Sequence, residues 1–405
     1  MTSVGADTGA GFRAQLNIHG EDWTGRNGLA EAARRLTLAL QRHGADIAIS
    51  TIPAGSPELG CTIPEEFRAF RTGRPYPIDL WTTNIHMFHL ASNVMYEPGY
   101  ARRYNIATWY WELSTLPERW AEVIKSVDEI WVPGRFVQRI FSRHTSLPVV
   151  VVPPVVPVLA PSAGSAKLRH RFGLPTNAVV FLFSFDYRSD INRKNPLAVV
   201  EAFERAIPTS ARGTDVYLVI KAINSWHNPA FAVRLKEAVH KVGGLLIDGY
   251  LSPNNMADLF NACDVYVSLH RGEGFGLGMA EAMAIGKAVI GTAYSGNLDF
   301  MTNTNSCLVG HELTTITQGD PRYEKKDMLC HYGEGSVWAE PDIDQAVLWM
   351  RLLAEDEDLR IRIGVQAASD IRQNFSEAEV ARVALNRLAI LARETGSDLP
   401  GVSAI

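Results

Sequence analysis

Short apolar runs alternate with longer runs of helical periodicity along most of this chain. Residues 14–19 predict a strand, residues 20–28 form a glycine-containing turn, and residues 29–43 carry apolar side chains at helical spacing. Residues 46–50 then return as a strand. A strand, a glycine loop, a helix and a second strand in this order are the usual start of a doubly wound domain. The alternation therefore predicts an α/β fold built on parallel sheets.

The alternation runs in two series, which a proline-marked segment separates. Residues 152–173 contain several prolines and a run of small residues, so we interpret them as a hinge. Residues 53–77 read as loop or short irregular structure. In the first series we expect further strands over 78–83, 105–109, 129–132 and 149–152, and helices over 117–126 and 134–143. In the second series we expect strands over 179–184, 216–221, 245–248, 265–269 and 288–291, and helices over 196–206, 229–241, 254–263, 277–285, 343–355, 359–373 and 377–394.

Length, charge and cysteine spacing narrow the class of protein. A chain of 405 residues suggests about two domains. The net charge of −5 argues against nucleic acid as a bulk electrostatic partner. The four cysteines are scattered without a C-x-x-C pair. This spacing disfavours a zinc site or a disulfide framework and fits a reducing compartment.

The chain shows no pattern typical of secretion or of membrane insertion. Its first 13 residues are small and polar and predict a disordered start. No uninterrupted apolar run approaches the ~20 residues needed to span a bilayer. We therefore expect a cytoplasmic protein, either fully soluble or lying on a membrane surface.

Two glutamates flank a glycine turn directly after a strand-like run. Residues 264–269 are apolar, Glu273 follows them, Gly274 and Gly276 come next, and Glu281 lies one turn into the following helix. The carboxyl end of a parallel strand is where open α/β sheets bind ligands. Backbone N–H groups at a helix N-terminus form an anion site. The alternative is a pair of surface carboxylates that the helix dipole favours.

A ligand with hydroxyls beside phosphates suits this mixture of carboxylates and amides. A carboxylate repels a bare phosphate but accepts hydrogen bonds from hydroxyls. Glu281 is placed to accept both ribose hydroxyls, and Glu273 is placed to meet a sugar. We therefore predict that a sugar nucleotide binds at this turn.

The segment Glu273-GFGLGMA-Glu281 resembles the E-x7-E signature of the retaining family 4 glycosyltransferases. The resemblance continues in residues 286–290, 248–251 and 259–265, so it covers nearly all of the second half, whereas the first half matches only in layout. It implies the GT-B fold, with two Rossmann-like domains that face each other across a cleft. The acceptor domain would be residues 1–160, to which the C-terminal helix of about 376–405 crosses back, and the donor domain residues 161–375.

The resemblance also assigns residues to the donor. Arg188 and Lys194 match positions that bind the donor diphosphate in relatives, and fixed cations stabilise such a leaving group as its bond breaks. The alternative for these two residues is a solvated basic loop, and Arg193 is expected to face solvent. The remaining donor-binding candidates are the turn residues Gly274, Phe275, Gly276 and Leu277 and the first-domain loop residues Gly25, Asn27 and Gly28, although any tight turn needs glycine.

The chain departs from the family pattern at three places. Relatives often carry a histidine after a first-domain strand, whereas residues 108–112 here read TWYWE. Glu112 and His86 are our candidates for that catalytic position, although His86 also fits a buried core histidine. His270 stands where relatives often have serine. Asp299 stands where a glutamate is common, so it lies by the nucleotide or caps a helix.

Two charged runs carry less specific information. Arg135, Arg139 and Arg143 recur along one predicted helix, which fits either a solvated face or a contact with an anionic membrane. Residues 355–358 are acidic but fall between two predicted helices, so we interpret them as a solvated turn. No carboxylate cluster indicates a metal, and the resemblance likewise implies that neither metal nor cofactor is required.

We therefore predict a retaining glycosyltransferase. It would move a sugar from a UDP- or GDP-linked donor to a hydroxyl of a glycan, a glycolipid or a small molecule. No nucleophilic carboxylate is evident, which favours attack from the face of the leaving group. The alternatives are a sugar-nucleotide epimerase, a phosphorylase on the same fold, and a non-catalytic subunit that binds nucleotide sugars.

Overall fold

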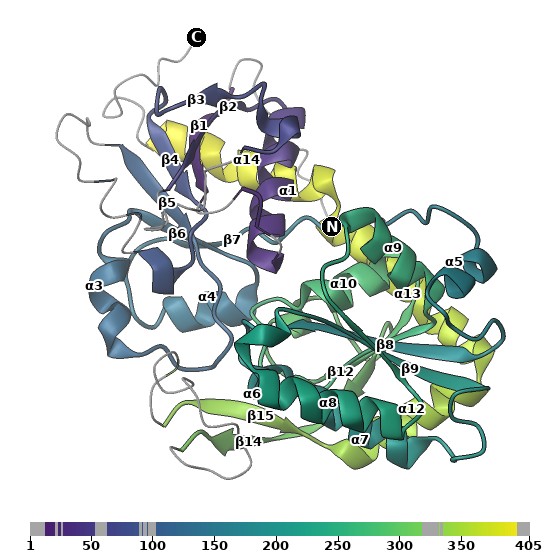
Figure 1. Ribbon diagram of the computed structural model, residues 1–405. Coiled ribbons are helices and arrows are strands. Elements are labelled where there is room, and N and C mark those ends of the chain that lie inside the picture. The colour runs from purple at the N-terminus through teal and green to yellow at the C-terminus, as the bar shows by residue number, and fades with distance from the viewer. Residues whose placement is uncertain are drawn as a thin grey trace, which may run out of the picture.

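The computed structural model describes residues 13–394, apart from 21–22, 26, 53–62, 89–90, 92–94, 96–102, 318–331 and 333–334. Figure 1 shows the arrangement of the elements. The expected disordered start before Arg13, much of the irregular segment over 53–77, and the end of the C-terminal helix beyond residue 394 lie outside the described residues.

Two parallel sheets form the cores of two halves, which confirms the predicted α/β class (Figure 1). In register, β1 (Gln15–Gly20) pairs with both β2 (Asp46–Thr51) and β4 (Ile78–Trp81), so that Leu16 lies opposite Ile47 on one side and Ile78 on the other. Within the described residues, the first sheet has the order β3 (Arg71–Thr72), β2 (Asp46–Thr51), β1 (Gln15–Gly20), β4 (Ile78–Trp81), β5 (Tyr104–Thr108), β6 (Glu129–Val132) and β7 (Val149–Val151). Within the same residues, the second has the order β10 (Leu245–Asp248), β9 (Val216–Ile223), β8 (Val179–Asp186), β11 (Val265–Ser268), β12 (Ala288–Thr292) and β13 (Cys307–Val309).

The helices of the first half follow the apolar periodicity, with one exception. α1 (Gly28–Arg42) begins where the Asn27 side chain accepts from the Ala30 amide, and α4 (Arg135–Phe141) buries one face. The single helix expected over 117–126 is wrong. This segment is a 3₁₀ turn, η3 (Glu118–Trp120), followed by one turn of α-helix, α3 (Ala121–Ile124), because Ile124 is the one fully buried side chain in these two elements. Two further 3₁₀ turns are η1 (Glu65–Phe67) and η2 (Ile85–Met87).

The second half contains helices on both faces of its sheet (Figure 1). They are α6 (Ile191–Lys194), α7 (Pro196–Ala206), α8 (Pro229–Lys241), α9 (Pro253–Ala262), α10 (Leu277–Ala284), α12 (Ile343–Glu355) and α13 (Glu357–Phe375), with 3₁₀ turns η4 (Ser225–His227) and η5 (Gly296–Asp299). The acidic run over 355–358 is the junction of α12 and α13, where Asp356 accepts from the Leu359 amide.

Several elements were not predicted. α5 (Ser165–Arg171) lies inside the expected hinge, and it is held by Arg169, which donates to the Ala262 carbonyl at 3.1 Å and to Asp264 at 2.6 Å. β13 and the antiparallel hairpin of β14 (His311–Thr315) and β15 (Val337–Pro341) also lack a clear apolar alternation. These elements depend on contacts distant in sequence.

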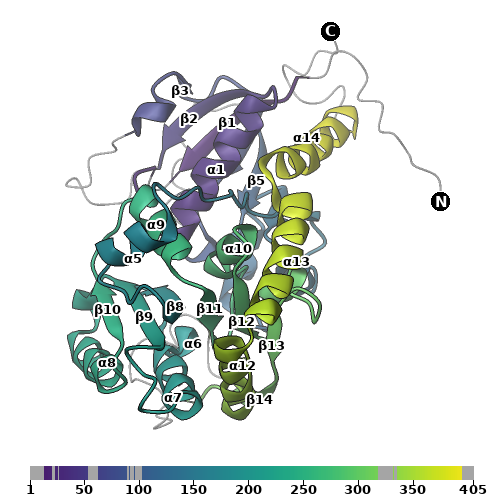
Figure 2. The same cartoon turned by 90° about the vertical axis from the view of Figure 1, so that its right-hand side faces the viewer.

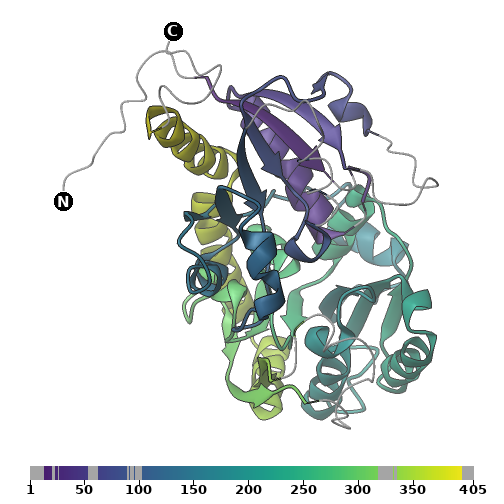
Figure 3. The same cartoon turned by 90° about the vertical axis from the view of Figure 1, so that its left-hand side faces the viewer.

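The last helix, α14 (Glu377–Glu394), packs on the first half. Its buried residues Ala384 and Leu388 share a core with Leu36 and Leu40 of α1. Figures 2 and 3 show α13 beside the second half and α14 continuing onto the first. None of the helices in the described part of the chain is both long and apolar enough to cross a bilayer.

A buried ion pair attaches α14 to the first sheet. Arg387 donates to both carboxylate oxygens of Glu129, at 2.6 and 3.0 Å, and Glu129 also accepts from the Trp131 indole at 2.7 Å. The Glu129 side chain is fully buried. Removal of Arg387 would leave this charge without its cation.

We predict that Arg387→Ala lowers the free energy of unfolding by about 3 kcal/mol, the usual cost of breaking a buried pair. The measurement is urea denaturation followed by intrinsic fluorescence. Arg382→Ala is the matched control, because Arg382 forms an exposed pair with Glu379 on the same helix, and its loss should cost at most about 0.5 kcal/mol. Equal effects of the two substitutions would contradict this account of how α14 is attached.

Candidate active site

A cleft of about 1490 Å³ is lined by residues of both halves. It lies over the carboxyl ends of the strands in the second sheet, as expected for an α/β ligand site. The expected site residues that line it are Gly25, Asn27, Gly28, His86, Glu112, Arg188, Lys194, Glu273, Gly274, Phe275, Gly276, Leu277 and Glu281.

The turn between β11 and α10 is held in place by close backbone packing. The Glu273 amide donates to the Ser295 hydroxyl at 2.8 Å, and the Gly296 amide donates to the Glu273 carbonyl at 2.9 Å. Gly276 has a φ of +95°, and a Cβ there would lie 2.4 Å from the Met279 side chain. Glycine is therefore favoured here by the left-handed backbone conformation, whereas the close atom is the flexible end of the Met279 side chain, which can shift.

The Glu273 carboxylate is buried between two cations. Its Oε1 lies 2.5 Å from the Lys194 ammonium and 3.4 Å from the Arg193 guanidinium. Burial alone would raise the pKa of Glu273, but Lys194 and Arg193 together lower it to about 2. Burial likewise lowers the pKa of Lys194, and Glu273 opposes that shift. The side chain of Glu273 is thus an anion at neutral pH.

Arg193 was expected to face solvent, and this prediction is wrong. The residue is only 4% exposed, and its guanidinium donates to the Gly272 carbonyl at 2.6 Å. It also lies 3.8 Å from Glu112 of the first half. The sequence motif does not predict that Arg193 is buried. Its position depends on the short helix α6, whose first turn is capped by the Asp190 side chain.

The two members of the expected basic pair lie in different surroundings. Lys194 contacts Glu273, whereas Arg188 lies exposed at the rim, with its guanidinium 5.8 Å from the ring centre of Trp226. A cation over an indole is weakly attracted and free to move. Arg188 lines the cleft without touching the turn.

Glu281 lies in α10 and makes its contact with the first half. Its Oε1 accepts from Arg35 of α1 at 2.7 Å, and both side chains are largely buried. Burial raises the pKa of Glu281, and Arg35 opposes this shift. The sequence does not predict that Arg35 contacts the site. The four-residue spacing of Glu31 and Arg35 is typical of an ion pair within one helix, so it gives no indication of a partner elsewhere.

The first half contributes polar groups that face the turn. Glu112 follows β5, and its carboxylate accepts from the Tyr332 hydroxyl at 3.5 Å. A Cβ on Gly272 would lie 2.5 Å from the Glu112 carbonyl, so the two halves touch here through backbone. His86 lies in η2 and lines the cleft.

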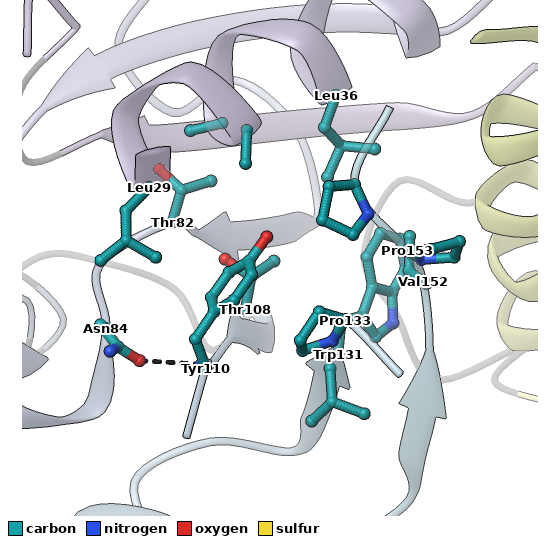
Figure 4. Close-up of a pocket in the computed structure, with 14 residues that line it drawn as sticks. Leu29, Leu36, Thr82, Asn84, Thr108, Tyr110, Trp131, Pro133, Val152 and Pro153 are labelled. Carbon is teal, nitrogen blue, oxygen red and sulfur yellow. Dashed lines mark hydrogen bonds between the residues drawn. The ribbon is translucent and has the colours of Figure 1, made fainter. Parts of the chain in front are cut away.

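A small recess of about 20 Å³ opens beneath α1, with room for about one water molecule. Figure 4 shows the Tyr110 ring between Thr108, Leu29 and Pro133, with the Tyr110 amide bonded to the Asn84 side chain. Burial raises the pKa of the Tyr110 hydroxyl. The recess adjoins the cleft, since Leu29, Asn84 and Tyr110 line both.

Asp299 and His270, at two of the positions where the chain departs from the family pattern, are not among the residues that line the cleft in the described part of the chain. Asp299 accepts from the Phe136 amide at 3.5 Å, so it sits at the N-terminus of α4 in the other half. The helix-cap alternative describes its position, and it is not among the described residues that line the cleft. His270 is buried, with its ring bonded to Ser268 at 3.0 Å and Asn297 at 3.1 Å, and burial lowers its pKa.

Lys221 and Tyr187 line the cleft at the ends of β9 and β8 and were not predicted. The Lys221 ammonium donates to the carbonyls of Ala222 and Gly249 at 2.8 and 2.6 Å, and burial lowers the pKa of Lys221 to about 8. A lone lysine in a strand has no sequence signal that marks it as part of a site.

Within the described residues, no group of three or more His, Cys, Asp or Glu side chains is arranged to hold a metal ion. On α4, Arg135 and Arg139 are exposed while Val137 and Ile140 are buried, and Arg143 lies exposed just beyond the helix. This arrangement fits both readings of the basic face.

Comparisons with known proteins agree with this fold. The architecture is that of the GT-B glycosyltransferases. A glycosyltransferase from Rickettsia africae ESF-5 has a TM-score of 0.66 and 14% identity, covering 94% of this chain and 99% of that one. HepE from Anabaena, solved with UDP and glucose, has a TM-score of 0.66 and 12% identity, covering 93% and 99%.

Comparison of sequences finds a family match within the second half of the chain. Residues 167–312, which include the turn, match the family model for glycosyl transferases group 1. A D-inositol 3-phosphate glycosyltransferase from Xylanimonas cellulosilytica is 30% identical over 174 residues. The match covers 40% of this chain and 39% of that relative.

The lowered pKa of Glu273 predicts how stability depends on pH. A fall from 4.5 to about 2 on folding corresponds to on the order of 3 kcal/mol, present above pH 4.5 and lost as the pH falls toward 2. We predict that urea midpoints of the native chain and of Glu273→Gln differ most at pH 6 and converge toward pH 3. A difference that is constant with pH would refute the ionised state assigned to Glu273.

Proposed function

We propose that this protein is a retaining glycosyltransferase that uses a UDP- or GDP-linked sugar as donor. The observation that carries this proposal is the row of Lys194, Glu273, the Gly274–Gly276 turn and Glu281 along one wall of the cleft. These residues offer cations, amides and carboxylates, the three kinds of group that would bind the diphosphate and the hydroxyls of a nucleotide-diphosphate sugar. They also lie in the segment that matches the group 1 family model.

The donor would lie along the second half. Glu281 accepts hydrogen bonds from the ribose hydroxyls. The diphosphate lies against the amides of the turn at the N-terminus of α10, with Lys194 beside it. Arg188 moves in from the rim to add a second cation. The transferred sugar lies toward Glu273.

The acceptor would enter from the first half. Glu112 and His86 line that wall. The loop of Gly25, Asn27 and Gly28 lines it too, and it would approach the donor phosphates as well as the acceptor. The acceptor is a hydroxyl of a glycan, a glycolipid or a small molecule. Glycan and glycolipid acceptors would place the enzyme in polysaccharide biosynthesis, in the cytoplasm or at the inner face of the membrane.

The proposed chemistry is a front-face displacement. The acceptor oxygen bonds to the anomeric carbon as the bond from that carbon to the diphosphate oxygen breaks. The acceptor oxygen attacks from the same face that the phosphate leaves, so configuration is retained, and its proton passes to the leaving phosphate oxygen. Lys194 and the turn amides stabilise the charge that develops on the phosphate. Glu273, with a pKa of about 2, carries no proton to donate and instead orients the sugar. No metal or cofactor takes part.

A thermal-shift screen against nucleotides and nucleotide sugars tests the donor class. A specific ligand raises the Tm according to its concentration over its Kd. We expect stabilisation by UDP or GDP and by one of their sugars. Interconversion of the donor sugar with no acceptor present would point to an epimerase, and binding without turnover across acceptors would point to a non-catalytic subunit.

Substitutions test the site itself. We predict that Lys194→Ala and Glu281→Ala each lower sugar transfer by roughly 100-fold or more while the chain stays folded, because each removes a contact to the donor nucleotide. Lys241→Ala is the control, since Lys241 is an exposed lysine of the same half, paired with Glu204. Near-normal transfer by either site variant, with circular dichroism unchanged, would reject the site assignment.

A further inference from the structure

We propose that Arg35, in the first half, is a positioning residue for the donor nucleotide in the second half. It holds the Glu281 carboxylate in place for the ribose, so the donor site is complete only when the two halves are together. This inference rests on the proposed function, because it concerns a nucleoside diphosphate at Glu281.

Arg35 is fixed from three directions. Its Nη2 lies 2.7 Å from Glu281, its Nε lies 2.7 Å from Glu31 one helical turn away, and its Nη1 lies 3.4 Å from the Val155 carbonyl. Val155 belongs to the segment that joins the two halves. The Arg35 side chain is 15% exposed, so solvent competes little for these contacts.

The same network reaches the glycine loop of the first half. Glu31 also pairs with Arg34 at 2.5 Å, and Arg34 donates to the carbonyls of Trp23 and Gly25 at 3.0 and 2.9 Å. One face of α1 therefore holds both the loop that lines the cleft and the carboxylate across from it.

The contact leaves Glu281 able to bind a diol. Arg35 uses one lone pair of Oε1, and an ionised carboxylate offers about four acceptor positions on its two oxygens. Two ribose hydroxyls can thus donate to Glu281 while Arg35 stays bound. A hydrogen bond to a charged acceptor is about twice as strong as a neutral one, so the benefit depends on Glu281 staying ionised.

The charge on Glu281 depends on its neighbours. Burial raises the pKa of Glu281, Arg35 lowers it, and Glu31 raises it further. Tyr266 of β11 also interacts with Glu281, and burial keeps its phenol neutral by raising its pKa. Without Arg35, the Glu281 pKa rises and the carboxyl gains a proton as the pH falls.

The test compares a nucleoside diphosphate with its 2′-deoxy counterpart. Calorimetric titration would measure the Kd of each for the native chain, Arg35→Gln and Arg42→Gln, with UDP or GDP chosen by the thermal-shift screen. Arg42 is the matched control, because it joins the same helix to Glu377 of α14, away from the cleft.

We expect Arg35→Gln to weaken binding of the ribonucleotide about 10-fold and of the deoxynucleotide much less, so that the preference for ribose shrinks. In this variant, ribonucleotide affinity should fall more steeply as the pH is lowered than it does for the native chain measured with the same ligand, because burial raises the Glu281 pKa and Arg35 no longer opposes that shift. Arg42→Gln should match the native chain in both respects. Arg35→Lys, which keeps the charge, should retain part of the ribose preference.

Two results would overturn the inference. One is an equal loss of affinity for the ribo- and deoxyribonucleotide in Arg35→Gln, which indicates a structural role alone. The other is a ribose preference unchanged from that of the native chain. Glu281→Ala, which removes the acceptor oxygens, separates this failure from that of the proposed function: if it leaves the ribose preference intact, Glu281 does not bind the ribose and the donor assignment itself fails.

Discussion

The buried Glu273 carboxylate is the group on which the rest of the site depends. An ionised carboxylate out of water is costly unless cations and hydrogen bonds surround it. Lys194 and Arg193 supply that charge from a segment some eighty residues earlier in the chain. Their pairing with Glu273 holds the short helix α6 against the β11–α10 turn. In the proposed function, a donor diphosphate would share the Lys194 cation with Glu273.

The first half completes this arrangement. Arg193 lies between Glu273 and Glu112, and Arg35 reaches across to Glu281. Each carboxylate of the E-x7-E segment is thus linked to a residue outside the turn. The backbone contact of Gly272 with Glu112 leaves no room for a larger residue between the halves. The cleft is therefore defined by both domains, although the recognisable motif lies in one.

The alternation of apolar runs was sufficient to predict two parallel sheets, because buried strands and amphipathic helices have distinct periods. The family resemblance also predicted Lys194 and Glu281 as residues of one donor site, and both line the cleft. Arg193 was predicted to face solvent because a run of basic residues is typical of a surface loop. Its burial depends on the Asp190 cap of α6 and on the hydrogen bond to the Gly272 carbonyl. Arg35 lies on a helix whose spacing already explains it as a pair with Glu31. The β14–β15 hairpin has no local pattern and depends on its neighbours.

The position of Asp299 could likewise not be decided from the sequence. Its residue type and place in the sequence fit a nucleotide ligand and a helix cap equally well. The structure places it against α4, a helix more than 150 positions earlier in the chain. Whether such a residue binds a ligand or caps a helix depends on contacts between the two halves, and the local sequence does not reveal those contacts.

The most direct test of the account is a crystal structure with the nucleoside diphosphate that stabilises the chain. The account predicts both ribose hydroxyls on Glu281, with Arg35 still bound to that carboxylate, and the diphosphate between Lys194 and the amides of Gly274–Gly276. A nucleotide bound elsewhere in the cleft, or one whose ribose lies away from Glu281, would contradict it.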